Sequence, residues 1–221
     1  VTSVATGNMR NGKGSCGIAP KCKFMPVSMG EHINTITMVE GLLYCMYHGA
    51  DVINLSCGSK FSDVVKRMSV EEQVKLSKQH GLPQENMWKY VFNLAEERNV
   101  TIVWAAGNDN VYTAMDESKR GHNTIRVSAV DRNLHKADFS NFGNFPNMNL
   151  AESTISAPGV DIFGALPGNA YDMWPGTSFS APIITGVVAL MKSINANLTT
   201  SEIIKILQET GLSLESAPEI G

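Results

Sequence analysis

The sequence lacks a strong excess of charge of either sign and lacks any long hydrophobic run. Its 221 residues carry 18 Lys and Arg against 21 Asp and Glu, which gives a net charge of −3. A basic surface of the kind that holds nucleic acid or an anionic membrane is therefore not expected. The longest apolar stretch, residues 181–191, contains Thr185 and is shorter than the roughly 20 residues of a membrane-spanning helix. We expect neither nucleic acid nor a membrane as a partner.

The sequence also lacks Cys-x-x-Cys pairs and the Cys/His spacings that bind zinc. Its four cysteines permit disulfides, but a chain of this length does not need them to stabilise a core. We expect four free, mostly buried thiols, at Cys16, Cys22, Cys45 and Cys57. Hydrophobic residues make up 43% of the chain and charged residues 18%, a balance that excludes disorder and is typical of a globular domain.

Short β-branched runs alternate with amphipathic stretches, which indicates parallel βαβ units with helices on both faces of a sheet. The periodicity predicts strands at 23–28, 51–56, 101–106 and 124–130, and helices at 35–47, 70–80 and from Pro83 to Ala95. Capping boxes pair Ser69 with Glu72 and Thr199 with Glu202, and each predicts a helix start. The predicted fold class is α/β, with three layers around a largely parallel central sheet.

Two segments carry the clearest chemical signals. Residues 175–182 (Pro-Gly-Thr-Ser-Phe-Ser-Ala-Pro) place Ser178 just before an apolar helical run. Backbone N–H groups at a helix N-terminus suit a nucleophile whose oxyanion needs donors, although a serine there is also a common N-cap. The strand at 101–106 runs into Gly107 and Asn108. A side-chain amide at the carboxyl end of a parallel strand can also donate to an oxyanion, although Gly-Asn is equally common in turns.

Together these segments resemble the subtilisin-like serine proteases, the subtilase family. Residues 176–182 resemble the family's serine motif, and residues 106–108 resemble its oxyanion motif. Residues 17–20, 51–58, 157–160 and 166–168 are similar to further family segments, and they occur in the family's order. The resemblance covers nearly all of the chain except residues 59–87. It implies that residues 1–221 are the C-terminal portion of a subtilisin-like catalytic domain, with a helical insertion at about 59–87.

The resemblance implies peptide-bond hydrolysis through an acyl-enzyme, with a peptide or protein as substrate. Ser178 would be the nucleophile, and Asn108 would donate to the oxyanion together with the Ser178 backbone N–H. The substrate-binding residues would be Ser56, Cys57, Gly58, Ala105, Ala106 and Gly107.

No cofactor is expected. Many subtilases bind calcium in the loop that here contains Asn8, Asn11 and Gly12. This loop carries no acidic residue, whereas calcium needs six to eight oxygen ligands, so calcium remains an alternative only.

The sequence departs from the family pattern at the catalytic base. A serine triad needs a histidine and a carboxylate that orients it, yet the family's His-Gly-Thr motif and its upstream Asp motif are both missing. Residues 1–5 resemble the helix that follows His-Gly-Thr, and Val1 is neither an initiator Met nor part of a signal peptide. We expect an upstream segment of the same precursor to carry both residues. The alternative is a catalytically inactive subtilase-like module used for binding or regulation.

The histidines of this chain are not expected to substitute for the missing base. His48-Gly49 and His80-Gly81 lie where helices are predicted to end, a position that favours both residue types for capping reasons. Surface positions are expected for His32, His122 and His135, and Asp131 is expected at a strand end.

Two further expectations follow from the resemblance. Residues 112–117 would approach the base of the first specificity pocket, where Asp116 and Glu117 would favour Lys or Arg in the substrate. Alternatively, Lys119 and Arg120 would neutralise these carboxylates and leave an apolar or mixed pocket. Because most subtilases act outside the cytoplasm, the resemblance also implies a secreted or extracytoplasmic protein.

Overall fold

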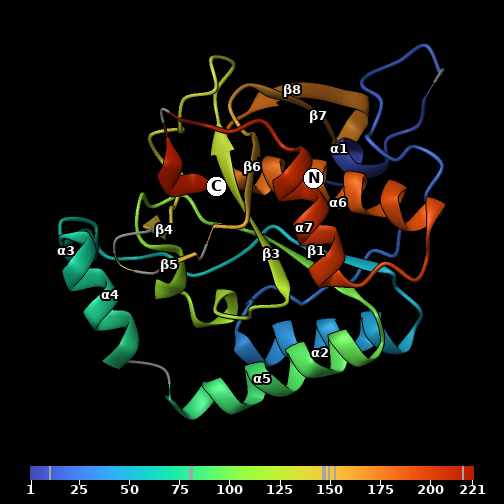
Figure 1. Ribbon diagram of the computed structural model, residues 1–221. Helices are drawn as coiled ribbons and strands as arrows, with labels where there is room; N and C mark the ends of the chain where they lie inside the picture. Colours follow the sequence, from blue (N-terminus) through green and yellow to red (C-terminus); the bar gives the residue numbers. More distant parts are fainter. Residues whose placement is uncertain (10, 80–81, 146–147, 149, 152, 216) are drawn as a thin grey trace.

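The structure is a computed structural model that describes residues 1–221 apart from 10, 80–81, 146–147, 149, 152 and 216. Its centre is a four-stranded sheet in the order β1-β2-β3-β6, in which every neighbouring pair is parallel. The strands are β1 (Val52–Leu55), β2 (Thr101–Ala105), β3 (Thr124–Val130) and β6 (Ile155–Pro158). Two antiparallel pairs lie outside this sheet (Figure 1): β4 (Asn144–Phe145) with β5 (Leu150–Ala151), and β7 (Ile162–Leu166) with β8 (Ala170–Trp174).

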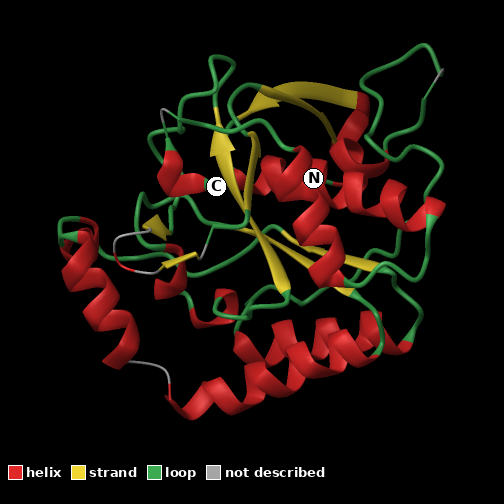
Figure 2. Cartoon of the chain, viewed as in Figure 1, coloured by secondary structure: helices red, strands yellow, loops and turns green. Residues whose placement is uncertain are grey.

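Helices cover both faces of the central sheet (Figure 2). On one face, α2 (Thr35–Tyr47) and α5 (Leu82–Glu97) pack against Ile102 and Trp104 of β2. On the other face, α6 (Thr177–Ile194) and α7 (Thr200–Thr210) pack against Val103 and Ala105 of the same strand. Successive side chains of a strand point to opposite faces, so β2 contributes to both cores and is buried throughout. This arrangement confirms the predicted three-layer α/β fold.

The helix starts follow the local signals in the sequence. Thr199 and Glu202 form the predicted capping box of α7. The backbone N–H of Ser69 donates to Glu72, and that of Glu72 donates to Ser69 Oγ, before α4 (Val70–Gln79). Asn34 caps α2 in the same reciprocal way. The smaller helices are α1 (Thr2–Thr6), α3 (Asp63–Lys66), and the 3₁₀ turns η1 (Thr113–Met115), η2 (Glu117–Lys119), η4 (Pro167–Asn169) and η5 (Pro218–Ile220).

Two expectations from the sequence are wrong. Residues 23–28 form no strand; a strand needs a neighbour for its backbone hydrogen bonds, and no described strand pairs with this segment. The thiols are all free, but only Cys45 is buried, because Cys16 and Cys22 lie in the exposed N-terminal loops and Cys57 is half-buried. The predicted helix end at His80 and its cap at Gly81 lie outside the described residues.

Helix α6 is the one described helix that is long and apolar enough to span a membrane. It packs against all four strands of the central sheet, and eight of its residues are buried. Its apolar character therefore follows from its place in the core of the fold.

Candidate active site

Ser178 is the second residue of α6. Gly176 occupies the N-cap position, with a φ of 141° that disfavours any residue with a side chain, so the N-cap residue itself offers no side chain to the first turn. Ser178 is therefore not the N-cap, and its hydroxyl does not satisfy the first turn of the helix. The side chain is half-buried at the end of α6 that meets the sheet.

A proline inside α6 explains how Ser178 is held. Pro182 has no backbone N–H, so the carbonyl of Ser178, four residues earlier, has no donor within the helix. Ser56 Oγ donates to this carbonyl oxygen at 2.9 Å, and Ser178 Oγ donates to the carbonyl oxygen of Ser56 at 3.2 Å. These two hydrogen bonds join the start of α6 to the residue that follows β1.

Asn108 lies beside the same helix start, after β2. Its Oδ1 accepts hydrogen bonds from the backbone N–H and the hydroxyl of Thr177, both at 2.9 Å. Because the side-chain oxygen is engaged, Nδ2 points the other way, and none of the described residues accepts a hydrogen bond from it. A Cβ placed on Gly176 would lie 3.5 Å from Asn108 Nδ2 and 3.7 Å from the Ser178 backbone nitrogen. Two N–H donors thus surround one small space that glycine leaves open.

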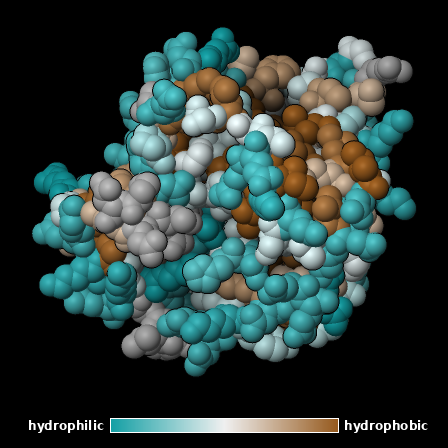
Figure 3. Space-filling model, in the orientation of Figure 1, coloured by the Kyte–Doolittle hydropathy of each residue, from teal (hydrophilic) through white to brown (hydrophobic). Residues whose placement is uncertain are grey.

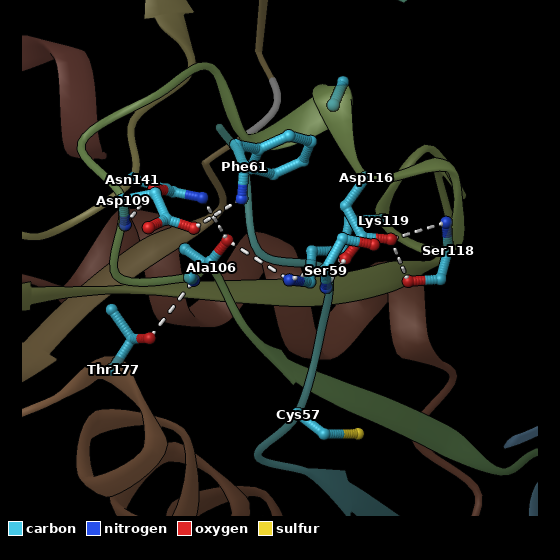
Figure 4. Close-up of polar contacts among 12 residues, drawn as sticks. Cys57, Ser59, Phe61, Ala106, Asp109, Asp116, Ser118, Lys119, Asn141 and Thr177 are labelled. Carbon is cyan, nitrogen blue, oxygen red and sulfur yellow. Dashed lines mark hydrogen bonds and ion pairs between the residues drawn. The ribbon is translucent and has the colours of Figure 1, made fainter. Parts of the chain in front are cut away.

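Asn141 fixes the loop that carries Asn108. Its Oδ1 accepts from the backbone N–H groups of Asp109 and Val111, at 3.0 and 3.1 Å, and its Nδ2 donates to the Ala106 carbonyl at 3.0 Å (Figure 4). The Asn141 side chain is 1% exposed, so these bonds are shielded from water. A side chain at Gly107 would collide with Asn141.

The residues expected to bind substrate lie at the carboxyl ends of the neighbouring strands β1 and β2. Ala105 and Ala106 are buried, whereas Ser56, Cys57 and Gly107 are half-buried. The Cys57 thiol contacts the sulfur of Met38 at 4.0 Å, and burial raises its pKa above the usual value. It behaves as a packing thiol here.

A buried ion pair lies between these two segments. Lys119 Nζ is 3.2 Å from Asp116 Oδ2 and donates to the Ala106 carbonyl at 3.3 Å (Figure 4). The same carboxylate accepts from the Ser59 backbone N–H at 2.8 Å and from Ser118 Oγ at 2.6 Å. Burial favours the neutral acid, but the charge of Lys119 and these hydrogen bonds outweigh it and hold the Asp116 pKa below its usual value. Of the two expectations for Asp116, the structure supports neutralisation by Lys119.

The segment between β1 and α5 packs against the loop that follows Asn108. Lys66 of α3 forms an ion pair with Asp109 at 2.7 Å, and the Phe61 backbone N–H donates to the same carboxylate. Gln73 of α4 is 2% exposed, and its Oε1 accepts from the Tyr112 backbone N–H at 2.7 Å. The expected insertion thus touches the candidate site through Asp109 and Tyr112.

None of the described histidines contacts Ser178. His48 caps the end of α2, where its Nδ1 lies 2.8 Å from the Tyr44 carbonyl and its ring stacks on Tyr44. His32, His122 and His135 are exposed, as expected, and His80 lies outside the described residues.

Asp131 lies in an exposed turn, where its Oδ2 is 3.6 Å from His135 Nδ1. Asp131 follows β3 and accepts from the backbone N–H groups of Asn133 and His135 in a turn. In the described part of the chain, no three His, Cys, Asp or Glu side chains come together as metal ligands.

Sequence reasoning missed the residues that position the donors. Gly176 creates the open space, Thr177 orients the Asn108 amide, and Asn141 and Gln73 hold the loop. Of these residues, only Gly176 and Thr177 could have been found from the sequence, because they belong to the serine motif. Asn141 and Gln73 pair with residues about 30 or more positions away, and one sequence gives no sign of such pairs.

The fold and this arrangement define an α/β protein with a serine at a helix start and an amide donor at the end of a neighbouring parallel strand. Residues 1–217 match the profile of the subtilase family. The chain therefore belongs to this family, whose characterised members include serine proteases.

Related proteins agree with this assignment. The chain is 29% identical over 213 residues to the thermophilic serine proteinase of Bacillus sp. (strain AK1), covering 95% of this chain and 45% of that protein. It is 28% identical to subtilisin BL of Lederbergia lenta, covering 94% of this chain and 67% of subtilisin BL. Among solved structures, the self-cleaved protease domain of PatA is 26% identical with a TM-score of 0.73, covering 99% of this chain and 76% of that domain. A protease from Pseudoalteromonas arctica is 25% identical with a TM-score of 0.74, over 99% of this chain and 65% of that one.

Proposed function

We propose that this chain supplies the nucleophile and the oxyanion donors of a serine endopeptidase. Ser178 attacks the peptide carbonyl, and the developing oxyanion accepts hydrogen bonds from Asn108 Nδ2 and the Ser178 backbone N–H. The observation that supports this most directly is that both donors lie within 4 Å of one point beside Gly176. Donors fixed around the place where charge develops stabilise the transition state without having to reorganise.

We propose further that the histidine and aspartate of the triad come from an upstream segment of the same precursor. Ser178 Oγ donates to the Ser56 backbone carbonyl, which is too weakly basic to take the proton, and no described histidine contacts the serine. The related PatA protease domain is longer, since the match spans only 76% of it. The Ser56–Gly58 and Ala105–Gly107 segments would bind the extended substrate, and family membership favours a secreted or extracytoplasmic protein.

One observation favours a second function, that of a catalytically inactive module for binding or regulation. Without a base, the Ser178–Ser56 hydrogen bonds link β1 to α6 and serve stability alone. The donor arrangement beside Gly176 argues for the enzyme, because a purely structural role does not need both donors within 4 Å of one point.

The first prediction separates the two functions. The purified 221-residue chain should show no proteolysis and no labelling by a fluorophosphonate probe, because a serine is a weak nucleophile without an adjacent base. Addition of the upstream segment, fused or as a separate chain, should restore both signals, and Ser178→Ala should abolish them. Peptidase activity of the isolated chain that Ser178→Ala removes would contradict the need for the segment. A completed protein that neither cleaves nor labels would establish the inactive module.

The second prediction concerns the insertion, which we propose shapes the candidate site rather than decorating the surface. Gln73→Ala removes the acceptor of the Tyr112 N–H in a buried position, so it should lower the free energy of unfolding by about 1–3 kcal/mol. Lys75→Ala, at an exposed position of the same helix, should change it by less than about 0.5 kcal/mol. Urea unfolding of the chain measures both.

The role of the insertion in catalysis is tested in the completed enzyme, that is, the chain joined to its upstream segment. Replacement of residues 70–79 by a Gly/Ser linker should slow cleavage. Unchanged cleavage of both peptides and folded proteins would mean that the insertion only decorates the surface.

A further inference from the structure

The two segments that follow β1 and β2 converge on Ser178. The segment after β1 begins at Ser56, whose carbonyl accepts a hydrogen bond from Ser178 Oγ at 3.2 Å. The segment after β2 ends at Asn108, whose Nδ2 lies within 4 Å of the same point beside Gly176 as the Ser178 backbone nitrogen. The proposed function places the extended substrate along both segments, with its reacting carbonyl at that point. The side chain of the residue before the cleaved bond therefore enters the space between them.

A buried ion pair occupies this space. Lys119 Nζ donates to the Ala106 carbonyl at 3.3 Å on the β2 side, and it is 3.2 Å from Asp116 Oδ2. Asp116 Oδ2 in turn accepts from the Ser59 backbone N–H at 2.8 Å on the β1 side (Figure 4). The side chains of Lys119 and Asp116 are 1% and 6% exposed, so the pair bridges the two segments from beneath.

Gly58 shows how closely the ammonium group approaches the first segment. A Cβ on Gly58 would collide with Lys119 Nζ and would lie 2.9 Å from Asp116 Oδ2. No side chain fits at this position while the pair is in place. Gly58 itself is exposed, whereas Lys119 directly behind it is buried. The surface between the two segments is therefore shallow, and the ammonium group forms its floor.

We propose that Lys119 is a specificity-determining residue, which restricts the substrate residue before the cleaved bond to glycine, alanine or serine. The inference rests on the proposed function and names the substrate class of that same site. A longer side chain, apolar or charged, would have to displace an ammonium group that a carboxylate and a carbonyl hold in place. Displacement would leave the Asp116 carboxylate buried without its partner, and the loss of one partner of a buried pair is strongly unfavourable.

The two pockets expected from the sequence predict other substrates. An open carboxylate at residue 116 would favour Lys or Arg, and a neutralised one would leave an apolar or mixed pocket. Both pockets need room for a long side chain, and the Lys119 side chain takes up that room. The roles of the pair therefore separate on substitution. Lys119 supplies the bulk that closes the space, and Asp116 supplies the charge that would attract a base once the space is open.

Product-like peptides test the restriction without a catalytic step. Acetyl-Ala-Thr-Ala-X peptides end in a free carboxylate, which can accept hydrogen bonds from Asn108 Nδ2 and the Ser178 N–H where the oxyanion would form. Titration of the chain, followed by NMR, gives the dissociation constants for X as alanine, methionine and lysine. Methionine is close to lysine in length but carries no charge. Alanine should bind at least about tenfold more tightly than the other two, since side-chain size in a pocket typically gives such discrimination.

Substitutions that open the space should change this ranking in two distinct ways. In Lys119→Ala, the lysine peptide should bind at least about tenfold more tightly than the methionine peptide, because its ammonium group replaces that of Lys119 beside Asp116. In Lys119→Ala/Asp116→Asn, the methionine peptide should become the tightest ligand, because no carboxylate remains to pair with a buried ammonium group. The double variant buries no charge alone, so it decides the question where Lys119→Ala does not fold.

A second lysine provides the matched control. Lys60 is exposed two residues beyond Gly58, and Lys60→Ala should leave the ranking of the three peptides unchanged. Far-ultraviolet circular dichroism and thermal unfolding verify that each variant is folded. A ranking that changed equally in Lys60→Ala and Lys119→Ala would mean that general surface charge, rather than the bulk of Lys119, selects the peptide.

The NMR signals also show where each peptide binds. Figure 3 shows hydrophobic surface where α1 and α6 lie, and Leu190 and Ile194 of α6 are 43% and 89% exposed. A long apolar side chain could bind there without entering the candidate site. Binding at the site should shift the amide signals of residues 106–108 and 176–178, whereas binding to this surface should shift those of residues 190–194. Only the first set of shifts counts toward the ranking.

Three results would each overturn the proposal. They are equal affinity of the wild-type chain for the three peptides, an unchanged ranking in both Lys119 variants, and no binding of the alanine peptide at the site. In the completed enzyme, kcat/KM for peptides with alanine, methionine or lysine before the cut should follow the same order as the affinities. Because the binding measurements need no catalytic base, a wrong ranking would leave the proposed protease function in place. A completed protein that fails to cleave would leave the restriction by Lys119 in place.

Discussion

Replacement of Asn108 by alanine is expected to lower kcat of the completed enzyme by about 10²–10³ while KM changes little. Asn108 Nδ2 and the Ser178 backbone nitrogen both lie within 4 Å of one point beside Gly176, and Thr177 holds the Asn108 side-chain oxygen with two hydrogen bonds. A donor so placed meets the substrate oxygen most closely when it carries negative charge, so its loss affects the transition state more than the bound substrate. Steady-state kinetics with a peptide amide substrate measure the split between kcat and KM.

Thr177→Val provides the internal control for this effect. It removes one of the two hydrogen bonds to Asn108 Oδ1 but leaves the amide itself in place, so kcat should fall by roughly tenfold, which is less than the loss of the donor. In an Asn108→Ala background the same substitution should have almost no further effect on kcat, because residues that act through one another are not additive. A decrease below about tenfold for Asn108→Ala would place the oxyanion donor elsewhere. Additive effects would show that Thr177 does not act through Asn108.

The elements that the sequence predicted are those that local signals specify. The helix at residues 35–47 and the strands near 52–55, 101–105 and 124–130 all form at the predicted places. Their patterns reflect burial on one or both faces, which each segment carries by itself. The capping box at Thr199 is equally local, since its two partners are three residues apart.

The strand predicted at residues 23–28 failed because a strand is not a local structure. Its residues are β-branched or aromatic in part, but backbone pairing needs a neighbour, and none of the described strands pairs with this segment. For the same reason, the sequence could not predict which residues hold the candidate site in place. The donors at Asn108 and Ser178 follow from motifs, whereas the bonds that orient them come from Asn141 and Gln73, which the fold brings from distant parts of the chain.

The sequence left open whether Asp116 would bind a Lys or Arg side chain of the substrate. In the structure, the 3₁₀ turn η2 brings Lys119 onto Asp116, three residues earlier, which favours neutralisation of the carboxylate. With 6% and 1% of the two side chains exposed, the carboxylate has its charge compensated inside the protein. A substrate Lys or Arg would have to displace a partner that is already in place. We therefore expect Asp116→Asn to leave the ratio of basic to apolar residues accepted by the completed enzyme unchanged.

Separate substitution of the two partners of this ion pair is expected to have the largest effect on stability. Lys119→Met leaves a buried, uncompensated carboxylate beside the segments that follow β1 and β2, and Asp116→Asn leaves a buried ammonium group beside Ala106. Removal of one partner of a buried pair typically costs about 3–5 kcal/mol, which is a large part of the 5–15 kcal/mol that stabilises most domains. The double variant should recover part of this loss, because neither charge is then buried alone. Urea unfolding of the four proteins gives the coupling energy, and additive losses would contradict a direct interaction.

The pH dependence of stability tests whether the surroundings of Asp116 stabilise its ionised form. Burial opposes ionisation of Asp116, but Lys119 and the hydrogen bonds from Ser118 and Ser59 prevail and lower the folded-state pKa below the usual aspartate value of 3.8. A carboxyl whose pKa is lower in the folded than in the unfolded state binds its proton more readily after unfolding. Its contribution to stability is therefore complete above pH 3.8 and is lost as the pH falls from there toward the folded-state pKa. The stability difference between the wild-type chain and Asp116→Asn should hence be constant from pH 5 to 7, where both pKa values lie well below the solution pH, and shrink below about pH 4. A difference that stayed constant into strong acid would mean that the Asp116 pKa is not lowered by folding, and that Lys119 does not stabilise its charge.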